Sequence, residues 1–448
     1  MTYYNETFII LSGLCAVLTY LTFNEKKSLI INSKNNNNNK NNDNSENSKA
    51  FYNFRRNYLI VYFFGTAGDW LQGPYLYTSY KNRGFDLNQI AILFVTGFLA
   101  SGIFGIIVGS AADKYGRKKF CLVYSLLYST SCLIIVLFSN FYILLFGRVL
   151  GGISTSLLFS VFEAWMISEH MLRGFDSDLL SDTFSYMSFG NGFVAIICGL
   201  LAGGLEKNYG ILSPFMMAIG FFIIAALMII INWNENFGKM IEQNNSSRSL
   251  TSSLSYAINI IKNDSFILVL GAVQSLFEAS MYIFVFLWGP LLEIQHKSNF
   301  NLYSKEELLP FGLIFSSFMV AIMIGSLIYG HMSGSKNISL STISHFNLLI
   351  ASISLLISTF VKNELLLFFF FTIFEFTCGI YFPLIGTLRA KVVPKNLHAT
   401  IGNLFRVPLN LIVVTILTSE FLISTKCLLC SLLLFIAFIL SFALPKTI

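Results

Sequence analysis

The chain has 448 residues, of which 55% are hydrophobic and 12% are charged, and its formal net charge is +6. A soluble globular protein carries roughly twice that share of charged residues, about 25%, so the composition excludes a soluble enzyme, a disordered scaffold and a disulfide-built secreted module. Long apolar runs recur along the sequence, and a membrane-spanning helix needs about 20 such residues. We therefore expect an all-α polytopic membrane protein embedded in a lipid bilayer.

The first apolar run covers about residues 3–23, and no Lys or Arg precedes Lys26. The run lacks the basic start of a cleaved signal peptide, so we expect residues 1–23 to be retained as an extra N-terminal transmembrane helix. A polar tract with asparagine at every position from 35 to 39 follows. Such low-complexity tracts do not bury a core, and residues 24–56 are expected to be a cytosolic, Asn-rich, disordered linker.

Twelve further apolar runs follow at regular spacing. The longest gap among them divides the series into an N-terminal six-helix half at 57–232, a central cytosolic loop at 233–265 and a C-terminal six-helix half at 266–444. Two halves with equal numbers of spans are the plan of many secondary transporters. The twelve predicted spans are 57–79, 87–111, 119–138, 141–167, 184–205, 211–232, 266–290, 308–332, 340–361, 364–388, 399–422 and 425–444.

The Lys and Arg residues are distributed unevenly between alternate loops. With residues 24–56 on the inner side, the inner loops and the C-terminus hold 20 of these residues and the outer loops hold 7. Cytoplasmic loops carry an excess of Lys and Arg. The distribution therefore predicts thirteen spans, with the N-terminus outside and the C-terminus in the cytosol.

The loop between the second and third of the twelve spans reads GSAADKYGRKK from Gly109 to Lys119. Gly109 is expected to let two helices approach closely, and Gly116 to allow a tight turn. Asp113 and Arg117 can pair across the helix ends and latch one conformation. The loop resembles the GxxxD(R/K)xGR(R/K) motif of the major facilitator superfamily, which it matches at Gly109, Asp113, Lys114, Gly116, Arg117 and Lys118.

This resemblance implies the major facilitator fold, in which two six-helix halves form the transporter. Longer stretches resemble one branch of the superfamily, the molybdate-anion transporters, in order over nearly the whole chain. The branch implies uptake of molybdate, and we expect secondary active transport by alternating access. No nucleophile–base pair is evident, so we expect no enzymatic activity. The plasma membrane is the expected location, and the sequence leaves an internal membrane open. The stretches include DWLQGPY at 69–75, GRVLGG at 147–152, FSVFEAW at 159–165, QSLFE at 274–278, CGIYFP at 378–383 and FRVP at 405–408.

Six ionisable residues stand out inside the predicted spans, where such residues are costly and usually functional. At 1.5 Å rise per residue, three of them lie roughly 16–18 Å from one end of their helices, near the midplane of a core about 30 Å thick. These three are Asp69, Glu278 and Glu375. The other three are Arg148, Glu163 and Arg406.

Arg148 and Arg406 are the expected substrate-binding cations, because a guanidinium group offers a planar fork of donors to a tetrahedral dianion. The alternative is that each arginine pairs with a carboxylate and only holds helices together. Four polar residues can add substrate contacts, although ordinary hydrogen bonds between helices explain each of them as well. They are Gln72, Tyr75, Tyr381 and Asn403.

Asp69, Glu278 and Glu375 cannot bind a dianion while they are ionised. Burial disfavours the ionised form of a carboxyl group, so these three residues are candidates for proton coupling. Protonation would also weaken their pairing with Arg148 and release it for the anion. Static pairing with arginine remains the alternative.

Glu163 differs from the other acids because it lies about four residues from the inner end of its predicted span. We expect it to contact Lys114 or Arg117 of the loop motif. Glu163 would then belong to the conformational latch.

No cofactor or metal is expected, because the sequence contains no GxxxxGK[ST] phosphate loop and no HExxH motif, and its five histidines are dispersed. We expect a monomer with molybdate or a similar oxyanion as substrate and no nucleic-acid partner. Two alternatives stay open. The chain can transport another oxyanion or an organic solute, or it can be a non-transporting membrane sensor on the same fold.

Overall fold

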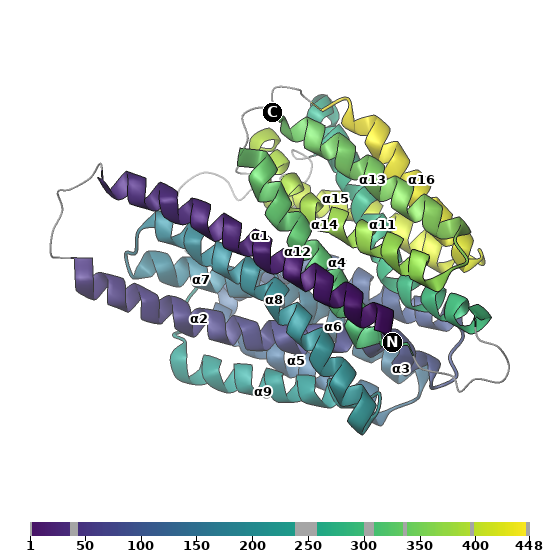
Figure 1. Cartoon of the computed structure of the whole chain (residues 1–448). Helices are drawn as coiled ribbons and strands as arrows, with labels where there is room; N and C mark the ends of the chain where they lie inside the picture. Colours follow the sequence, from purple (N-terminus) through teal and green to yellow (C-terminus); the bar gives the residue numbers. More distant parts are fainter. Residues whose placement is uncertain are drawn as a thin grey trace. The chain divides into compact units, whose positions relative to one another are not determined.

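The computed structural model describes residues 2–35, 44–237, 258–299, 309–334, 338–394 and 398–444. Within these ranges the chain forms helices joined by short connections and contains no β-strand (Figure 1). The all-α fold predicted from the sequence is therefore confirmed. The helices are α1 (Thr2–Asn35), α2 (Asn44–Gln72), η1 (Gly73–Tyr75), α3 (Leu76–Lys81), α4 (Leu87–Tyr115), α5 (Arg117–Leu137), α6 (Phe141–Leu158), α7 (Val161–Leu172), α8 (Ser177–Tyr209), α9 (Ser213–Asn232), α11 (Ser265–Asn299), α12 (Phe311–Gly334), α13 (Leu340–Phe360), α14 (Glu364–Val392), α15 (His398–Thr418) and α16 (Ile423–Ser441).

Eleven helical segments of the described chain are long and apolar enough to cross a membrane, which makes this a multi-pass membrane protein. The first is Thr2–Thr22, on the predicted extra span. The predicted span 57–79 falls on α2, η1 and α3, and the chain tightens into a 3₁₀ turn where Pro74 follows Gly73. The predicted span 399–422 falls on α15, whose apolar part is the shorter stretch Leu404–Thr418.

The chain divides into two compact units. The N-terminal unit comprises Gly13–Arg83 and Thr96–Met240. The C-terminal unit comprises Met1–Ser12, Gly84–Val95 and Ile241–Ile448. The long helices α1 and α4 each contribute residues to both units, so the unit boundaries fall inside helices as well as in loops.

Part of the tract predicted to be a disordered linker is helical. Helix α1 extends to Asn35 and α2 begins at Asn44, while residues 36–43 lie outside the described residues. Phe51 and Phe54 are buried, with their ring centroids 5.3 and 5.6 Å from that of Phe175. Burial of these aromatic side chains stabilises the start of α2. The asparagine-rich composition of residues 24–56 gives no indication of this burial. The other predicted domain boundaries stay predictions.

Stacked aromatic side chains form the core of the N-terminal unit. The rings of Trp165 and Trp233 stack with centroids 3.8 Å apart, and Tyr58 stacks on Trp233 at 5.8 Å. The indole N–H of Trp165 donates a hydrogen bond of 2.9 Å to the carbonyl oxygen of Asn234. These contacts hold α7 and α2 against the end of α9.

Aromatic packing also joins α11 and α14 in the C-terminal unit. Phe277 stacks on Tyr381 with ring centroids 3.8 Å apart, and Phe284 lies 4.7 Å from Phe374. All four side chains are buried. This packing fixes α11 against α14, and with them the polar side chains beside these rings.

Helices α4 and α6 approach each other closely in the N-terminal unit. A Cβ atom added to Gly152 would collide with the backbone oxygen of Gly97 and lie 2.9 Å from the backbone nitrogen of Ser101. Only glycine fits between the two backbones at this point. The close approach brings Arg148, one turn before Gly152 on α6, over the surface of α4.

Candidate substrate site

A carboxylate, a phenol and a guanidinium meet inside the N-terminal unit. The hydroxyl of Tyr128 on α5 donates a hydrogen bond to Oδ1 of Asp69 on α2. Arg148 on α6 lies close enough to Asp69 to attract its charge. The Tyr128 hydroxyl also lies 3.5 Å from Oγ1 of Thr155, and its ring stacks on Phe222 at 4.8 Å. Asp69 is thus held by one neutral donor and faces one cation.

The guanidinium of Arg148 lies over two glycines. A Cβ built on Gly97 would be 2.5 Å from Nη2 of Arg148, and a Cβ built on Gly151 would be 3.7 Å from Nη1. A side chain at Gly97 would take up space that the guanidinium fills, whereas Gly151 lies at ordinary van der Waals distance from it. The local sequence of α4 and α6 therefore fixes where the positive charge sits.

Two of the predicted substrate-binding residues in this unit form hydrogen bonds with other residues of the same unit. Gln72 is buried, and its Nε2 donates a 3.1 Å hydrogen bond to the carbonyl oxygen of Gly68 one turn earlier. Tyr75 is buried as well and forms a hydrogen bond with the carboxylate of Glu206 on α8. These contacts favour the reading of ordinary hydrogen bonding for both residues.

The C-terminal unit contains a similar arrangement around Glu278 on α11. The hydroxyl of Tyr381 on α14 donates a 3.3 Å hydrogen bond to Oε1 of Glu278, and the Gln274 amide also forms a hydrogen bond with this carboxylate. Arg406 and Arg389 both lie close enough to attract the charge of Glu278. In each unit a carboxylate, Asp69 on α2 or Glu278 on α11, is therefore held by a tyrosine and faces arginine.

Arg406 and Glu375 occupy contrasting environments. Arg406 on α15 is exposed. Glu375 on α14 is buried, and its carboxylate forms a hydrogen bond with the Cys378 thiol of the same helix. Within the described residues, Glu375 has no tyrosine or arginine partner like those of Asp69 and Glu278. The side chain of Asn403 lies outside the described residues.

The predicted latch loop contains the expected ion pair. The guanidinium of Arg117, at the start of α5, lies 2.7 Å from Oδ1 of Asp113 near the end of α4. Gly116 between the helices has φ of +113°, a conformation that favours glycine. The ammonium of Lys114 lies 5.1 Å from the centroid of the Tyr115 ring.

Two expectations for this loop differ from the structure. Apart from the neighbouring residues and backbone of its own helix, no described atom lies within 4 Å of a Cβ built on Gly109, so the predicted close helix contact is absent there. Glu163 forms no ion pair with Lys114 or Arg117 within the described residues. It is exposed on the first turn of α7, on the side of Tyr58, and the Asp113 carboxylate takes its place beside Arg117.

Glu235 is the acid that contacts the loop. Its Oε1 accepts a 2.8 Å hydrogen bond from the backbone N–H of Lys118, in the first turn of α5. The backbone N–H of Arg117 donates to the carbonyl oxygen of Asn236 at 3.0 Å. The segment after α9 therefore caps α5. The sequence signal is weak, because Glu235 follows the motif by more than a hundred residues.

Comparisons with known proteins agree with this architecture. A family model described as "Sugar-transporters, 12 TM" matches residues 8–367. The molybdate-anion transporter of Xenopus tropicalis is 35% identical over 417 residues, which cover 90% of this chain and 85% of that protein. The molybdate-anion transporter of Xenopus laevis is 36% identical over 375 residues, covering 81% and 78%. The crystal structure of a mutant of the nucleoside transporter NupG is 13% identical, with a TM-score of 0.69 over 87% of this chain and 99% of that one.

Proposed function

This chain belongs to the molybdate-anion transporter family of the major facilitator superfamily, and we propose that it moves molybdate across a membrane as a secondary active transporter that works by alternating access. The observation that supports the cargo most strongly is the identity of 35% to a molybdate-anion transporter over 90% of the chain. The fold supports a transporter, and the charged groups inside each unit suit an anionic cargo.

In the N-terminal unit, Arg148 is the proposed anion-binding group. Its guanidinium is held over Gly97 and Gly151, and it faces the carboxylate of Asp69. A tetrahedral oxyanion can accept two parallel N–H hydrogen bonds from one guanidinium. The anion would compete with Asp69 for Arg148, and protonation of Asp69 would favour the anion. Tyr128 keeps the carboxylate in place during this exchange, because its hydroxyl donates to Asp69.

In the C-terminal unit, Arg406 and Glu278 are proposed to play the matching roles. Arg406 is exposed and attracts Glu278, which Tyr381 holds by a hydrogen bond of 3.3 Å. Arg389 is a further cation beside the same carboxylate, and we include it among the candidate anion-binding groups. Buried Gln274 has no hydrogen-bond partner for its Oε1 within the described residues. That oxygen can accept a hydrogen bond from Glu278 when Glu278 is protonated.

Proton coupling is the proposed energy source, with Asp69 and Glu278 as the proton carriers. Each acid faces an arginine, so its protonation state controls a cation that the substrate needs. Glu375 is the weaker candidate because the group bonded to its carboxylate is the Cys378 thiol and not a cation. For membrane placement, we propose the plasma membrane, an external N-terminus, a cytosolic C-terminus and a monomer.

Another oxyanion is the second candidate cargo. Molybdate and sulfate are both tetrahedral dianions, so a site built from guanidinium groups can accept either. Uptake of molybdate into proteoliposomes, with excess sulfate as competitor and with or without an imposed pH gradient, separates these cases. We expect saturable uptake that resists sulfate and responds to the gradient. Absence of molybdate flux from folded protein would refute the assigned cargo. Another oxyanion, an organic solute or a non-transporting sensor would then remain.

A further inference from the structure

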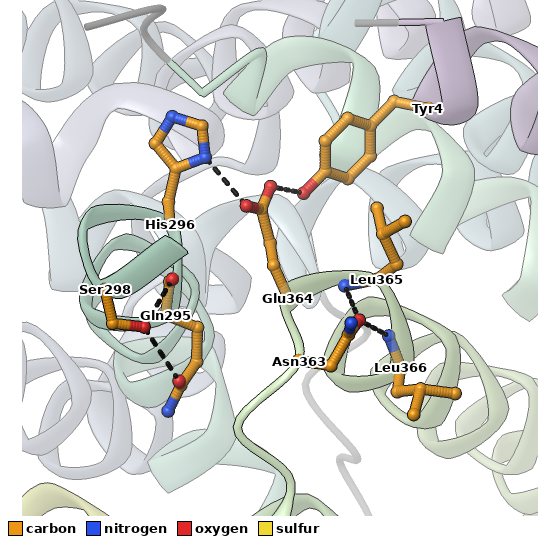
Figure 2. A network of polar contacts seen from close by, with 8 residues as sticks. All are labelled: Tyr4, Gln295, His296, Ser298, Asn363, Glu364, Leu365 and Leu366. Carbon is orange, nitrogen blue, oxygen red and sulfur yellow. Dashed lines mark hydrogen bonds and ion pairs between the residues drawn. The ribbon is translucent and has the colours of Figure 1, made fainter. Parts of the chain in front are cut away.

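The first turn of the extra N-terminal helix is hydrogen-bonded to α14 of the C-terminal unit, through a glutamate that also contacts α11. Figure 2 shows the Glu364 carboxylate, at the start of α14, between Tyr4 of α1 and His296 of α11. The Tyr4 hydroxyl donates to Oε1 of Glu364, and Nδ1 of His296 lies 2.8 Å from Oε2. We call these three residues the Glu364 clamp. One carboxylate thus joins three helices that are far apart in the sequence.

His296 and Glu364 stand at opposite ends of their two helices and are largely shielded from water. Glu364 is the first residue of α14, where the partial positive charge of the helix end stabilises an anion. His296 lies in the last turn of α11. The side chains are only 18% and 12% exposed for His296 and Glu364, respectively. Partial removal from water strengthens such a pair relative to a surface salt bridge.

Aromatic contacts fix the tyrosine of the clamp. The ring of Tyr4 packs edge-on against Phe368, one turn after Glu364, with centroids 4.9 Å apart. Tyr3 packs on the same Phe368 ring at 6.4 Å but is 36% exposed. Beyond this turn, Ile9 and Ile10 of α1 are exposed. Tyr4 is therefore the residue that joins α1 to the carboxylate.

The clamp acts on a part of α11 that lies beyond a proline. Pro290 lies inside α11, between Glu278 and His296. A proline has no backbone N–H and interrupts the helical hydrogen bonds, so the helix can bend there. Glu364 therefore holds the end of α11 that bending at Pro290 would release.

We propose that Tyr4 and Glu364 are positioning residues for transport: Tyr4 orients Glu364, and Glu364 holds the segment of α11 beyond Pro290 against α14. The proposal rests on the proposed function, because α11 and α14 are the seventh and tenth of the twelve predicted spans, which the family resemblance places along the cavity. Release of the clamp frees this segment and changes the rate of the transport cycle. The groups proposed to bind the anion remain in place, since none of them belongs to the clamp.

A spin label on the end of α11 tests the clamp directly. Ser298 is exposed in the last turn of α11, and all seven native cysteines are buried, so Ser298→Cys can be labelled selectively in the full-length protein. In this background Tyr4→Phe removes only the hydroxyl that reaches Glu364. The matched control is Tyr3→Phe, which removes a neighbouring hydroxyl outside the clamp.

We expect Tyr4→Phe and Glu364→Gln to raise the ratio of mobile to immobile label about tenfold, equivalent to about 1.4 kcal/mol and typical of a lost hydrogen bond to a charged group. Tyr3→Phe should leave the spectrum unchanged. In proteoliposomes, both clamp variants should change the maximal rate of molybdate uptake while KM stays within about twofold.

Identical spectra for Tyr4→Phe and Tyr3→Phe would overturn the proposal, as would a changed KM at an unchanged maximal rate. Should Glu364→Gln fail to fold, Tyr4→Phe decides alone, because it leaves the ring on Phe368. The spectra need no substrate. A wild-type protein that fails to carry molybdate therefore refutes the proposed function without affecting this measurement of the clamp.

Discussion

Replacing Gly97 with alanine tests whether the position of the Arg148 guanidinium controls transport. The added Cβ would lie 2.5 Å from Nη2, 3.1 Å from Cζ and 3.2 Å from Nε of Arg148. All three atoms belong to the far end of a flexible side chain. The side chain can therefore move aside, and the backbone of α4 need not shift.

The size of the displacement follows from these distances. Non-bonded heavy atoms ordinarily lie about 3.5 Å apart, so the guanidinium must retreat from Gly97 by about 1 Å. A misplacement of about 1 Å in a positioned group can lower a rate roughly 100-fold. Alanine inside a helix is favoured over glycine by about 0.5–1 kcal/mol. Gly97→Ala should therefore lose most of its uptake without loss of stability.

Uptake of molybdate into proteoliposomes and thermal unfolding of the same preparation check both parts of this prediction. Gly220→Ala on α9 is the matched control, because a Cβ built there meets no atom of the described chain within 4 Å. The control should transport like the wild type. Normal uptake by Gly97→Ala would show that Arg148 tolerates displacement, and a lowered unfolding temperature would show that the helix contact had been damaged instead.

Three further outcomes are expected. Gly152→Ala places a Cβ against the backbone of α4 and should lower the free energy of unfolding by about 1–3 kcal/mol, measured by thermal or denaturant unfolding. Glu235→Ala removes the acceptor for the Lys118 N–H and should cost about 1 kcal/mol at the start of α5, seen as faster amide hydrogen exchange there. Arg148→Ala should abolish molybdate uptake while the protein still reaches the membrane. Unchanged uptake would exclude Arg148 from the substrate site.

Short-range features of the site were predictable from the sequence. The spacing of Asp113 and Arg117 allows an ion pair across one tight turn, and the structure contains that pair at 2.7 Å. Gly116 has the positive φ that its place between two helices predicts. Such features depend on neighbouring residues, so the local sequence contains the information that specifies them.

Partners from distant parts of the chain were not predictable. Tyr128 contacts Asp69 across 59 residues, and Glu235 contacts the Lys118 backbone across 117 residues. Any of several spans can supply such a partner, and only the packing of α5 against α2, α6 and α9 selects it. Within the described residues the expected contact of Glu163 with the loop is absent, and the local Asp113 carboxylate lies beside Arg117.

The sequence by itself determined that this protein is an all-α membrane protein of the major facilitator type. Hydrophobic runs, loop charges and a local motif act over one span or one turn, so they can be recognised without knowing which helices touch. Only the tertiary structure decided three contacts: Tyr128 with Asp69, the Arg148 guanidinium with Gly97, and Tyr4 of the extra helix with Glu364. These contacts arise when helices pack side by side, and packing brings together groups whose separation along the chain carries no signal.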